Sequence, residues 1–121
     1  LTLDKLADAP AGEISGGQMK LLELGRVLMG DPKVILLDEP AAGVNPALTE
    51  VLVEKIQGLN AKGQTFFIIE HNMDFIKSAD HVIDFGPKSG DAGGKVVAKG
   101  TPEEIVNNPK SVTGEYLRQV I

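Results

Sequence analysis

Cysteine and tryptophan are both absent from the 121 residues, and only two histidines occur. Without cysteine the chain has no disulfide framework, no thiolate metal site and no thiol redox chemistry, and with so few histidines a zinc site is not expected. Unbroken apolar runs reach only four residues, as at Val34 to Leu37, whereas a helix that spans a bilayer needs roughly 20. No charged-then-apolar signal segment opens the chain, so a cytoplasmic protein is the expectation.

Positive charge is also in short supply, because 17 acidic residues outnumber 12 basic ones and leave a net charge of −5. Proteins that bind nucleic acid on their own usually carry a basic patch, so this balance argues mildly against that class. The length fits one domain with a modest core. With 42% hydrophobic and 24% charged residues, the composition is ordinary for a soluble globular protein.

Apolar periodicity and turn residues predict an alternation of helices and strands. Asp31-Pro32 ends the first helix, because the residue before a proline leaves the α region, and Asn45-Pro46 supplies an N-cap and a first turn for the second. Val34 to Asp38 is expected to be a strand buried on both faces of a parallel sheet. The predicted helices are 17–30, 46–62, 73–79, a capped helix from Thr101 and a tail from Thr113, and the predicted strands are 34–38, 65–69, 81–85 and 95–98. This alternation predicts an α/β fold with a mainly parallel sheet flanked by helices.

Two short motifs stand out from this framework. In Ser15-Gly16-Gly17-Gln18, serine and glutamine at this spacing form a capping box. The two glycines are poor helix formers, however, and suit a place where backbone amides approach an anion at a helix start. The second motif, Asp38-Glu39, closes an apolar strand. Its acids could simply mark a strand that ends in solvent, but carboxylates at the end of a parallel strand also lie where α/β sheets bind ligands.

Together, Ile14-Ser15-Gly16-Gly17-Gln18 and Val34-Ile35-Leu36-Leu37-Asp38-Glu39-Pro40 resemble the signature loop and the Walker B strand of ATP-binding cassette (ABC) ATPases. The resemblance implies that ATP and Mg²⁺ are the cofactors. It implies that the signature loop, Ser15 to Gln18, reaches the γ-phosphate held by a second cassette, with the Ser15 hydroxyl and the Gly17 amide as donors. Asp38 would hold Mg²⁺ through water, and Glu39 would polarise the attacking water as general base.

Two further site assignments follow from the same resemblance. Ala41 to Pro46 occupies the place of the D-loop, which contacts the partner cassette through Gly43 and Asn45. Many members carry aspartate where Asn45 stands, so a role that depends on charge is in doubt there. His71, after the second predicted strand, matches the switch histidine that contacts the γ-phosphate. His81 has no such context and is expected to be structural.

The chain contains no Gly-x-x-x-x-Gly-Lys-Ser/Thr loop to hold its own nucleotide. We therefore expect the C-terminal half of a P-loop NTPase-type cassette, without the phosphate-loop half. Residues 1–30 would be the end of the helical subdomain, and residues 31–121 would be part of the RecA-like core and the C-terminal segment. This chain alone is expected to be inactive, and an uncovered sheet edge would favour pairing with a second copy.

The two parts of the chain resemble different subfamilies. Residues 14–60, with the Ala-Gly-Val-Asn-Pro loop, resemble the ATP-binding subunits of branched-chain amino-acid importers. Residues 64–117, with the glycine-rich stretch Gly86 to Gly94, resemble the damage-recognition ATPase of nucleotide excision repair. The repair ATPase generally carries glutamate in place of Gln18, so we favour the transporter. A catalytically inactive module that only binds a partner remains a third class.

The partners differ between these interpretations. All imply a second cassette, as a homodimer or a heterodimer. The transporter adds membrane permease subunits and a location at the inner face of the membrane, while the repair ATPase adds DNA.

Overall fold

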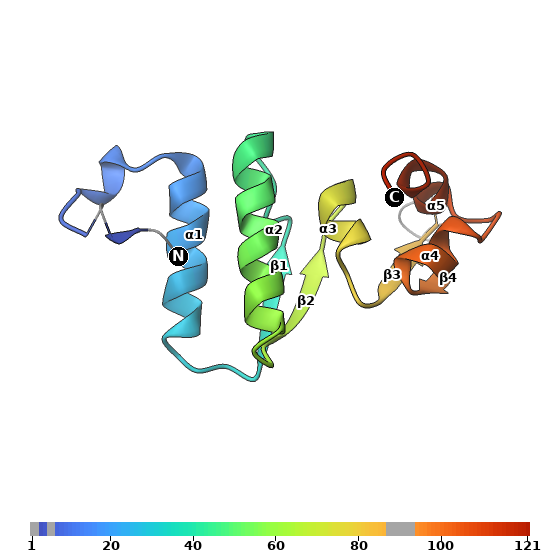
Figure 1. Cartoon of the computed structure of the whole chain (residues 1–121), viewed down its shortest axis with the longest axis horizontal. Helices are drawn as coiled ribbons and strands as arrows, with labels where there is room; N and C mark the ends of the chain where they lie inside the picture. The colour runs from blue at the N-terminus through green and yellow to red at the C-terminus, as the bar shows by residue number, and fades with distance from the viewer. Residues whose placement is uncertain (1–2, 5–6, 87–93) are drawn as a thin grey trace. The chain divides into compact units, whose positions relative to one another are not determined.

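The two halves of the chain fold around separate two-stranded sheets. In a computed structural model, which describes residues 3–4, 7–86 and 94–121, the chain divides into two compact units, Leu1–Glu70 and His71–Ile121 (Figure 1). The first unit contains the predicted signature loop and the Asp38-Glu39 pair. The second begins with the predicted switch histidine.

A parallel strand pair crossed by one helix forms the centre of the first unit. β1 (Val34–Asp38) pairs in parallel with β2 (Thr65–Ile69), in register from Val34 opposite Thr65 to Asp38 opposite Ile69. α2 (Pro46–Asn60) makes the crossover between them, and α1 (Gly16–Leu28) precedes β1, after a short 3-10 helix at Ala11–Glu13. The βαβ unit predicted from the alternation is confirmed here.

The two faces of the β1–β2 sheet have opposite exposure. Ile35 is only 1% exposed and belongs to the unit's core. The other buried apolar side chains of this core are Leu21, Leu24, Leu52 and Ile56. On the opposite face Leu36 is 75% exposed, and Val34, Phe67 and Ile69 are also exposed. The expectation that β1 is buried on both faces is therefore wrong for this structure, because helices pack on one side of the pair only.

Two acidic residues that precede prolines take left-handed backbone conformations. The φ angle is 47° at Asp31 and 44° at Glu39. At Asp31 this confirms that the helix ends before Pro32, and α1 stops at Leu28, two residues earlier than predicted. After α2, Gly63 has a φ of 95°, as expected for a glycine just past a helix end.

The described residues of the second unit form an antiparallel pair of strands and three short helices. α3 (Met73–Lys77) leads into β3 (Val82–Phe85), which pairs antiparallel with β4 (Val96–Gly100), and α4 (Pro102–Val106) and α5 (Val112–Leu117) follow. This pair departs from the parallel pattern because only residues 86–95 separate the two strands, fewer than the dozen or so that a parallel crossover needs. Within the glycine-rich stretch Gly86 to Gly94, residues 87–93 lie outside the described part of the chain.

A buried carboxylate fastens the last helix of the second unit. Asp84 on β3 accepts hydrogen bonds from the hydroxyls of Ser111 (2.5 Å) and Thr113 (2.7 Å). Ser111 is the N-cap of α5 and accepts the amide of Gly114 at 2.8 Å. The core beneath consists of Ile76, Ala98, Ile105 and Leu117. The predicted capped start at Thr101 is confirmed as a capping box with Glu104.

Candidate functional site

The predicted nucleotide-facing motifs of the first unit lie at one end of it. Figure 1 shows α1 and α2 starting at the end of the unit where β1 and β2 finish. Since the signature loop opens α1, Asp38 closes β1 and Asn45 caps α2, the fold gathers these residues on the side where parallel strands bind ligands. His71 is the first residue of the second unit, and its position is defined within that unit.

The start of α1 is a complete capping box. The Ser15 hydroxyl accepts the amide of Gln18 at 3.3 Å, and the Gln18 side chain accepts the amide of Ser15 at 2.8 Å. A hydroxyl has two acceptor positions and one donor, so its capping role leaves the Ser15 proton for another acceptor. Ser15 and Gly16 are exposed, and a dissolved anion could therefore reach this helix start.

The two glycines of the signature loop have different surroundings. A Cβ on Gly16 would meet nothing within 4 Å, whereas one on Gly17 would lie 1.7 Å from Leu48 Cδ2. A side chain at position 17 would therefore displace the Leu48 side chain, so the packing of α1 against α2 favours glycine there, whatever its amide does. Sequence reasoning missed this contact, since nothing in the spacing of residues 17 and 48 marks it.

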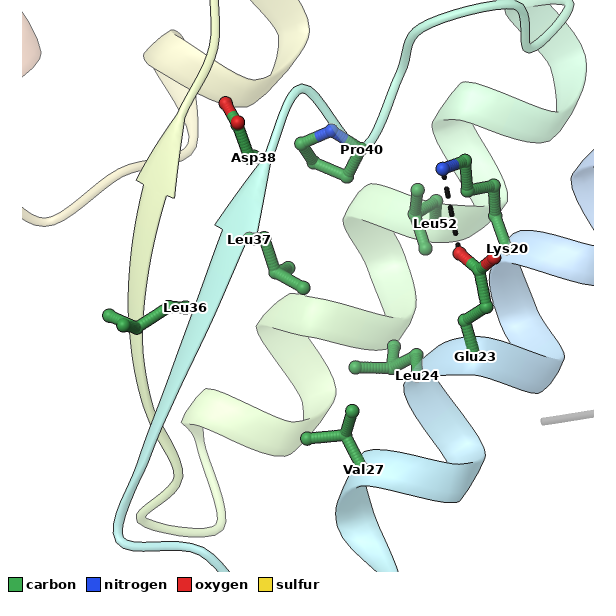
Figure 2. A pocket seen from close by; sticks show the side chains of 9 residues that line it. All are labelled: Lys20, Glu23, Leu24, Val27, Leu36, Leu37, Asp38, Pro40 and Leu52. Carbon is green, nitrogen blue, oxygen red and sulfur yellow. Dashed lines mark ion pairs between the residues drawn. The ribbon is translucent and has the colours of Figure 1, made fainter.

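Asp38 and Glu39, at the end of β1, are accessible to solvent. Both are exposed, and the amide of Glu39 continues the strand pairing by donating to the Ile69 carbonyl at 2.9 Å. In Figure 2 the Asp38 carboxylate lies at the end of β1 and points away from the leucines below it. An exposed carboxylate is a hard oxygen donor of the kind that Mg²⁺ prefers, so Asp38 fits the role of a magnesium ligand.

The loop from β1 to α2 is shaped by one glycine and one cap. Gly43 has a φ of 71°, a conformation that only glycine adopts without strain. Asn45 is the N-cap of α2, and its side-chain oxygen accepts the amide of Leu48 at 3.0 Å. The capping role predicted for Asn45 is confirmed, and it explains how a neutral side chain serves at this position.

Glu70, which sequence reasoning did not single out, contacts the same loop. Its carboxylate oxygen Oε1 accepts the backbone amide of Ala41 at 2.8 Å in a partly buried site. The signal available in the sequence was its place at the end of β2, next to the predicted switch histidine. Neighbouring parallel strands end together, so an acid there could be expected beside Asp38.

A small pocket of about 210 Å³ lies between β1 and the two helices of the first unit. In Figure 2 the side chains of Leu24, Val27 and Leu37 converge on it. The ion pair between Lys20 and Glu23, 3.5 Å apart, lines its rim. Its lining is mostly apolar, and Asp38 is its one acidic residue besides the paired Glu23. This chemistry does not suit a triphosphate, so the pocket is not the nucleotide site.

Among the residues that the structure describes, no three His, Asp or Glu side chains cluster as a metal site. No helix in the same residues is long and apolar enough to cross a membrane.

Comparisons with known proteins agree with the motifs. The ABC transporter family profile matches residues 1–42. The UvrABC system protein A of Aquifex aeolicus is 45% identical over 115 residues, which cover 93% of this chain and 12% of that protein. A probable branched-chain amino acid transport ATP-binding protein, LivG of Archaeoglobus fulgidus, is 44% identical over 113 residues, covering 93% of this chain and 42% of its own length.

Solved structures show the same likeness in three dimensions. UvrA2 from Deinococcus radiodurans matches with a TM-score of 0.79 and 38% identity, over 93% of this chain and 14% of that one. A nucleotide-free ATP-binding cassette from an ABC transporter matches at 0.76 and 40% identity, over 96% of this chain and 44% of its own. The chain belongs to the ATP-binding cassette family.

This cassette chain spans less than half the length of each relative named above. Its α/β fold, with one parallel and one antiparallel pair of strands, matches cassette structures. Family membership brings ATP and Mg²⁺ as the ligands of cassettes in general. The relatives are divided between transport and UvrABC proteins, and neither group is favoured by identity.

Proposed function

We propose that this chain is the C-terminal half of the ATP-binding subunit of an ABC transporter, of the branched-chain amino-acid importer type. The observation that carries the proposal is Gln18. Its neutral side chain completes the capping box with Ser15. The excision-repair ATPase generally carries a glutamate at this position, which would place a negative charge at the helix start. A helix start without a carboxylate attracts a phosphate more strongly. The likeness to LivG, over 42% of that protein, supports the same choice.

In this proposal two cassettes close around ATP. The Ser15 hydroxyl and the Gly17 amide of one cassette donate to the γ-phosphate held by the phosphate loop of the other, with Gly16 and Gln18 completing the loop. Gly43 and Asn45 contact the partner cassette. Hydrolysis reopens the pair, and the movement passes to a membrane permease at the inner face of the membrane.

The chemistry falls to residues at the strand ends. Asp38 holds Mg²⁺ through water, since a hard cation prefers a carboxylate oxygen. Glu39 accepts a proton from the attacking water as general base, and His71 donates to the γ-phosphate. Residues 1–30 form the end of the helical subdomain, and residues 31–121 form part of the RecA-like core and the C-terminal segment.

A second candidate is a DNA-repair ATPase, favoured by the 45% identity to a UvrABC system protein A and the TM-score of 0.79 to UvrA2. The experiment compares ATP turnover by the whole protein that carries this chain, with duplex DNA and with its co-purifying permease in lipid vesicles. Stimulation by the permease supports transport, and stimulation by DNA alone replaces the transport proposal with repair. The Glu39→Gln variant, assayed in parallel, shows that the turnover belongs to this site.

A further inference from the structure

The backbone at Glu39 is held in a conformation that its neighbours in the sequence oppose. Its φ is 44°, where L-residues other than asparagine and aspartate are uncommon. Pro40 follows, and a residue before proline is pushed toward extended conformations. A strained backbone of this kind persists only where surrounding bonds specify it.

Hydrogen bonds on both sides of Glu39 provide that specification. The Glu39 amide donates to the Ile69 carbonyl at 2.9 Å, and the Ala42 amide donates to the Glu39 carbonyl at 3.0 Å. Pro40 has no amide to contribute. The next amide along the loop, that of Ala41, donates to Glu70 Oε1 at 2.8 Å.

The bond from Ala41 differs from the other two because its acceptor is a charged side chain. Glu70 is partly buried, and Pro40 between the two anchored amides is buried. A carboxylate binds a backbone amide more strongly than a neutral carbonyl does, and burial shields the bond from water. Ile69 and Glu70 are consecutive residues at the end of β2. They accept the amides of Glu39 and Ala41, which lie on either side of the Glu39–Pro40 peptide.

We propose that Glu70 is a positioning residue for the ATPase reaction. By holding the Ala41 amide it keeps Glu39 in its left-handed conformation, and so aims the Glu39 carboxylate at the attacking water. This inference rests on the proposed function, in which Glu39 is the general base. Glu70 itself touches neither water nor nucleotide in this role.

Two conservative variants of Glu70 separate the effect of side-chain length from the effect of side-chain charge on the bond to Ala41. Glu70→Gln keeps the length of the side chain and an Oε1 acceptor, while Glu70→Asp keeps the charge but withdraws the carboxylate by one methylene. Glu54→Ala, at an exposed position on α2, is the matched control. Because the bond requires the reach of the side chain and is strengthened by its charge, Asp is expected to release the loop and Gln to hold it less tightly than Glu does.

The first readout is amide hydrogen exchange at Ala41, measured by NMR on the 121-residue chain. Glu70→Asp is expected to accelerate exchange at Ala41 by about tenfold or more, since the amide becomes open to water. Glu70→Gln should accelerate exchange at Ala41 by only a few-fold, about twofold to threefold, and Glu54→Ala should leave it at the wild-type rate. Unchanged exchange in Glu70→Asp overturns the proposal without any reference to activity. A Glu70→Ala variant that fails to fold would change nothing, because the Gln and Asp pair decides the question.

The second readout is turnover in the whole ATPase. Glu70→Asp should lower kcat by about tenfold to a hundredfold, as expected for a misplaced catalytic group, while KM for ATP changes less than about twofold. Glu70→Gln should restore most of the rate. Combining Glu70→Asp with Glu39→Gln should add no further loss, since the group being positioned is already gone.

The two failures can be told apart. If Glu39→Gln leaves turnover intact, the proposed function fails, whatever happens at Ala41. If Glu39→Gln abolishes turnover but Glu70→Asp does not lower kcat, Glu39 is the base and the positioning role of Glu70 is overturned.

Discussion

Gly17 and Leu48 are in contact so close that a single methyl group cannot be placed between them. A Cβ at position 17 would lie 1.7 Å from Leu48 Cδ2 and 2.7 Å from its Cγ. The contact joins the start of α1 to the first turn of α2, the two helices that start at the end of the unit where β1 finishes. The glycine of the signature loop thus has a packing role as well as its proposed role toward phosphate.

The contact predicts that Gly17→Ala destabilises the chain while Gly16→Ala does not. Because the outer atoms of Leu48 would have to leave their place against α1, Gly17→Ala should lower the free energy of unfolding by about 1–3 kcal/mol. Gly16 has open space around it, and alanine there should be neutral or stabilising by up to about 1 kcal/mol. Urea denaturation of both variants, followed by circular dichroism, checks this. Equal stabilities would contradict the contact.

Asp84 should be a main determinant of stability in the second unit. Asp84→Ala removes the acceptor of two hydroxyls, Ser111 and Thr113, so we expect a loss of about 3 kcal/mol. Thr113→Val, which removes one of the two bonds, should cost about 1–2 kcal/mol. Asp80→Ala, at an exposed position just before β3, is the control and should stay within about 0.5 kcal/mol. If thermal unfolding gives Asp84→Ala and Asp80→Ala the same stability, the hydrogen bonds of Asp84 do not stabilise this unit.

Glu39→Gln in the whole ATPase should slow turnover by orders of magnitude while ATP binding survives. Glutamine keeps the size of the side chain but cannot accept a proton from water. Steady-state ATP hydrolysis measures the first effect, and binding of a fluorescent ATP analogue measures the second. A loss of less than about tenfold, or about 1.4 kcal/mol of barrier, would remove Glu39 as the general base.

The 121-residue chain alone should bind MgATP weakly or not at all. The reason is chemical, since its sequence has no Gly-x-x-x-x-Gly-Lys-Ser/Thr loop to surround the phosphates with backbone amides. Isothermal titration calorimetry of the purified chain is the measurement. A sub-micromolar Kd would show that the residues present here make a nucleotide site without that loop.

Local chemistry made most of the elements predictable. β1 and β2 have the predicted bounds because each is a short apolar run closed by polar or turn residues. The starts of α2 and α4 were predictable from Asn45-Pro46 and Thr101-Pro102, since a cap and a proline define a first turn locally. The end of α1 was placed two residues late, because Met29 and Gly30 continue its path as tighter turns, with the Gly30 amide on the Val27 carbonyl.

The contacts that shape the candidate site were not predictable in the same way. Gly17 with Leu48, and Ala41 with Glu70, join residues 31 and 29 positions apart. Such pairs depend on how helices and strands pack, and no local propensity encodes them. The motif singled out Asp38 and Glu39 as candidates at the strand end. It could not show that Glu39 takes a left-handed conformation or that a neighbouring acid holds its loop.

The exposed apolar face of the β1–β2 sheet is a liability while the chain is being synthesised. Leu36, Phe67 and Ile69 would meet water until another surface covers them. Exposed apolar strands of this kind are what cellular chaperones capture and what drives newly made protein into aggregates. The amount of soluble protein in a cell should therefore depend on how soon another surface covers this face, before any ATP is hydrolysed.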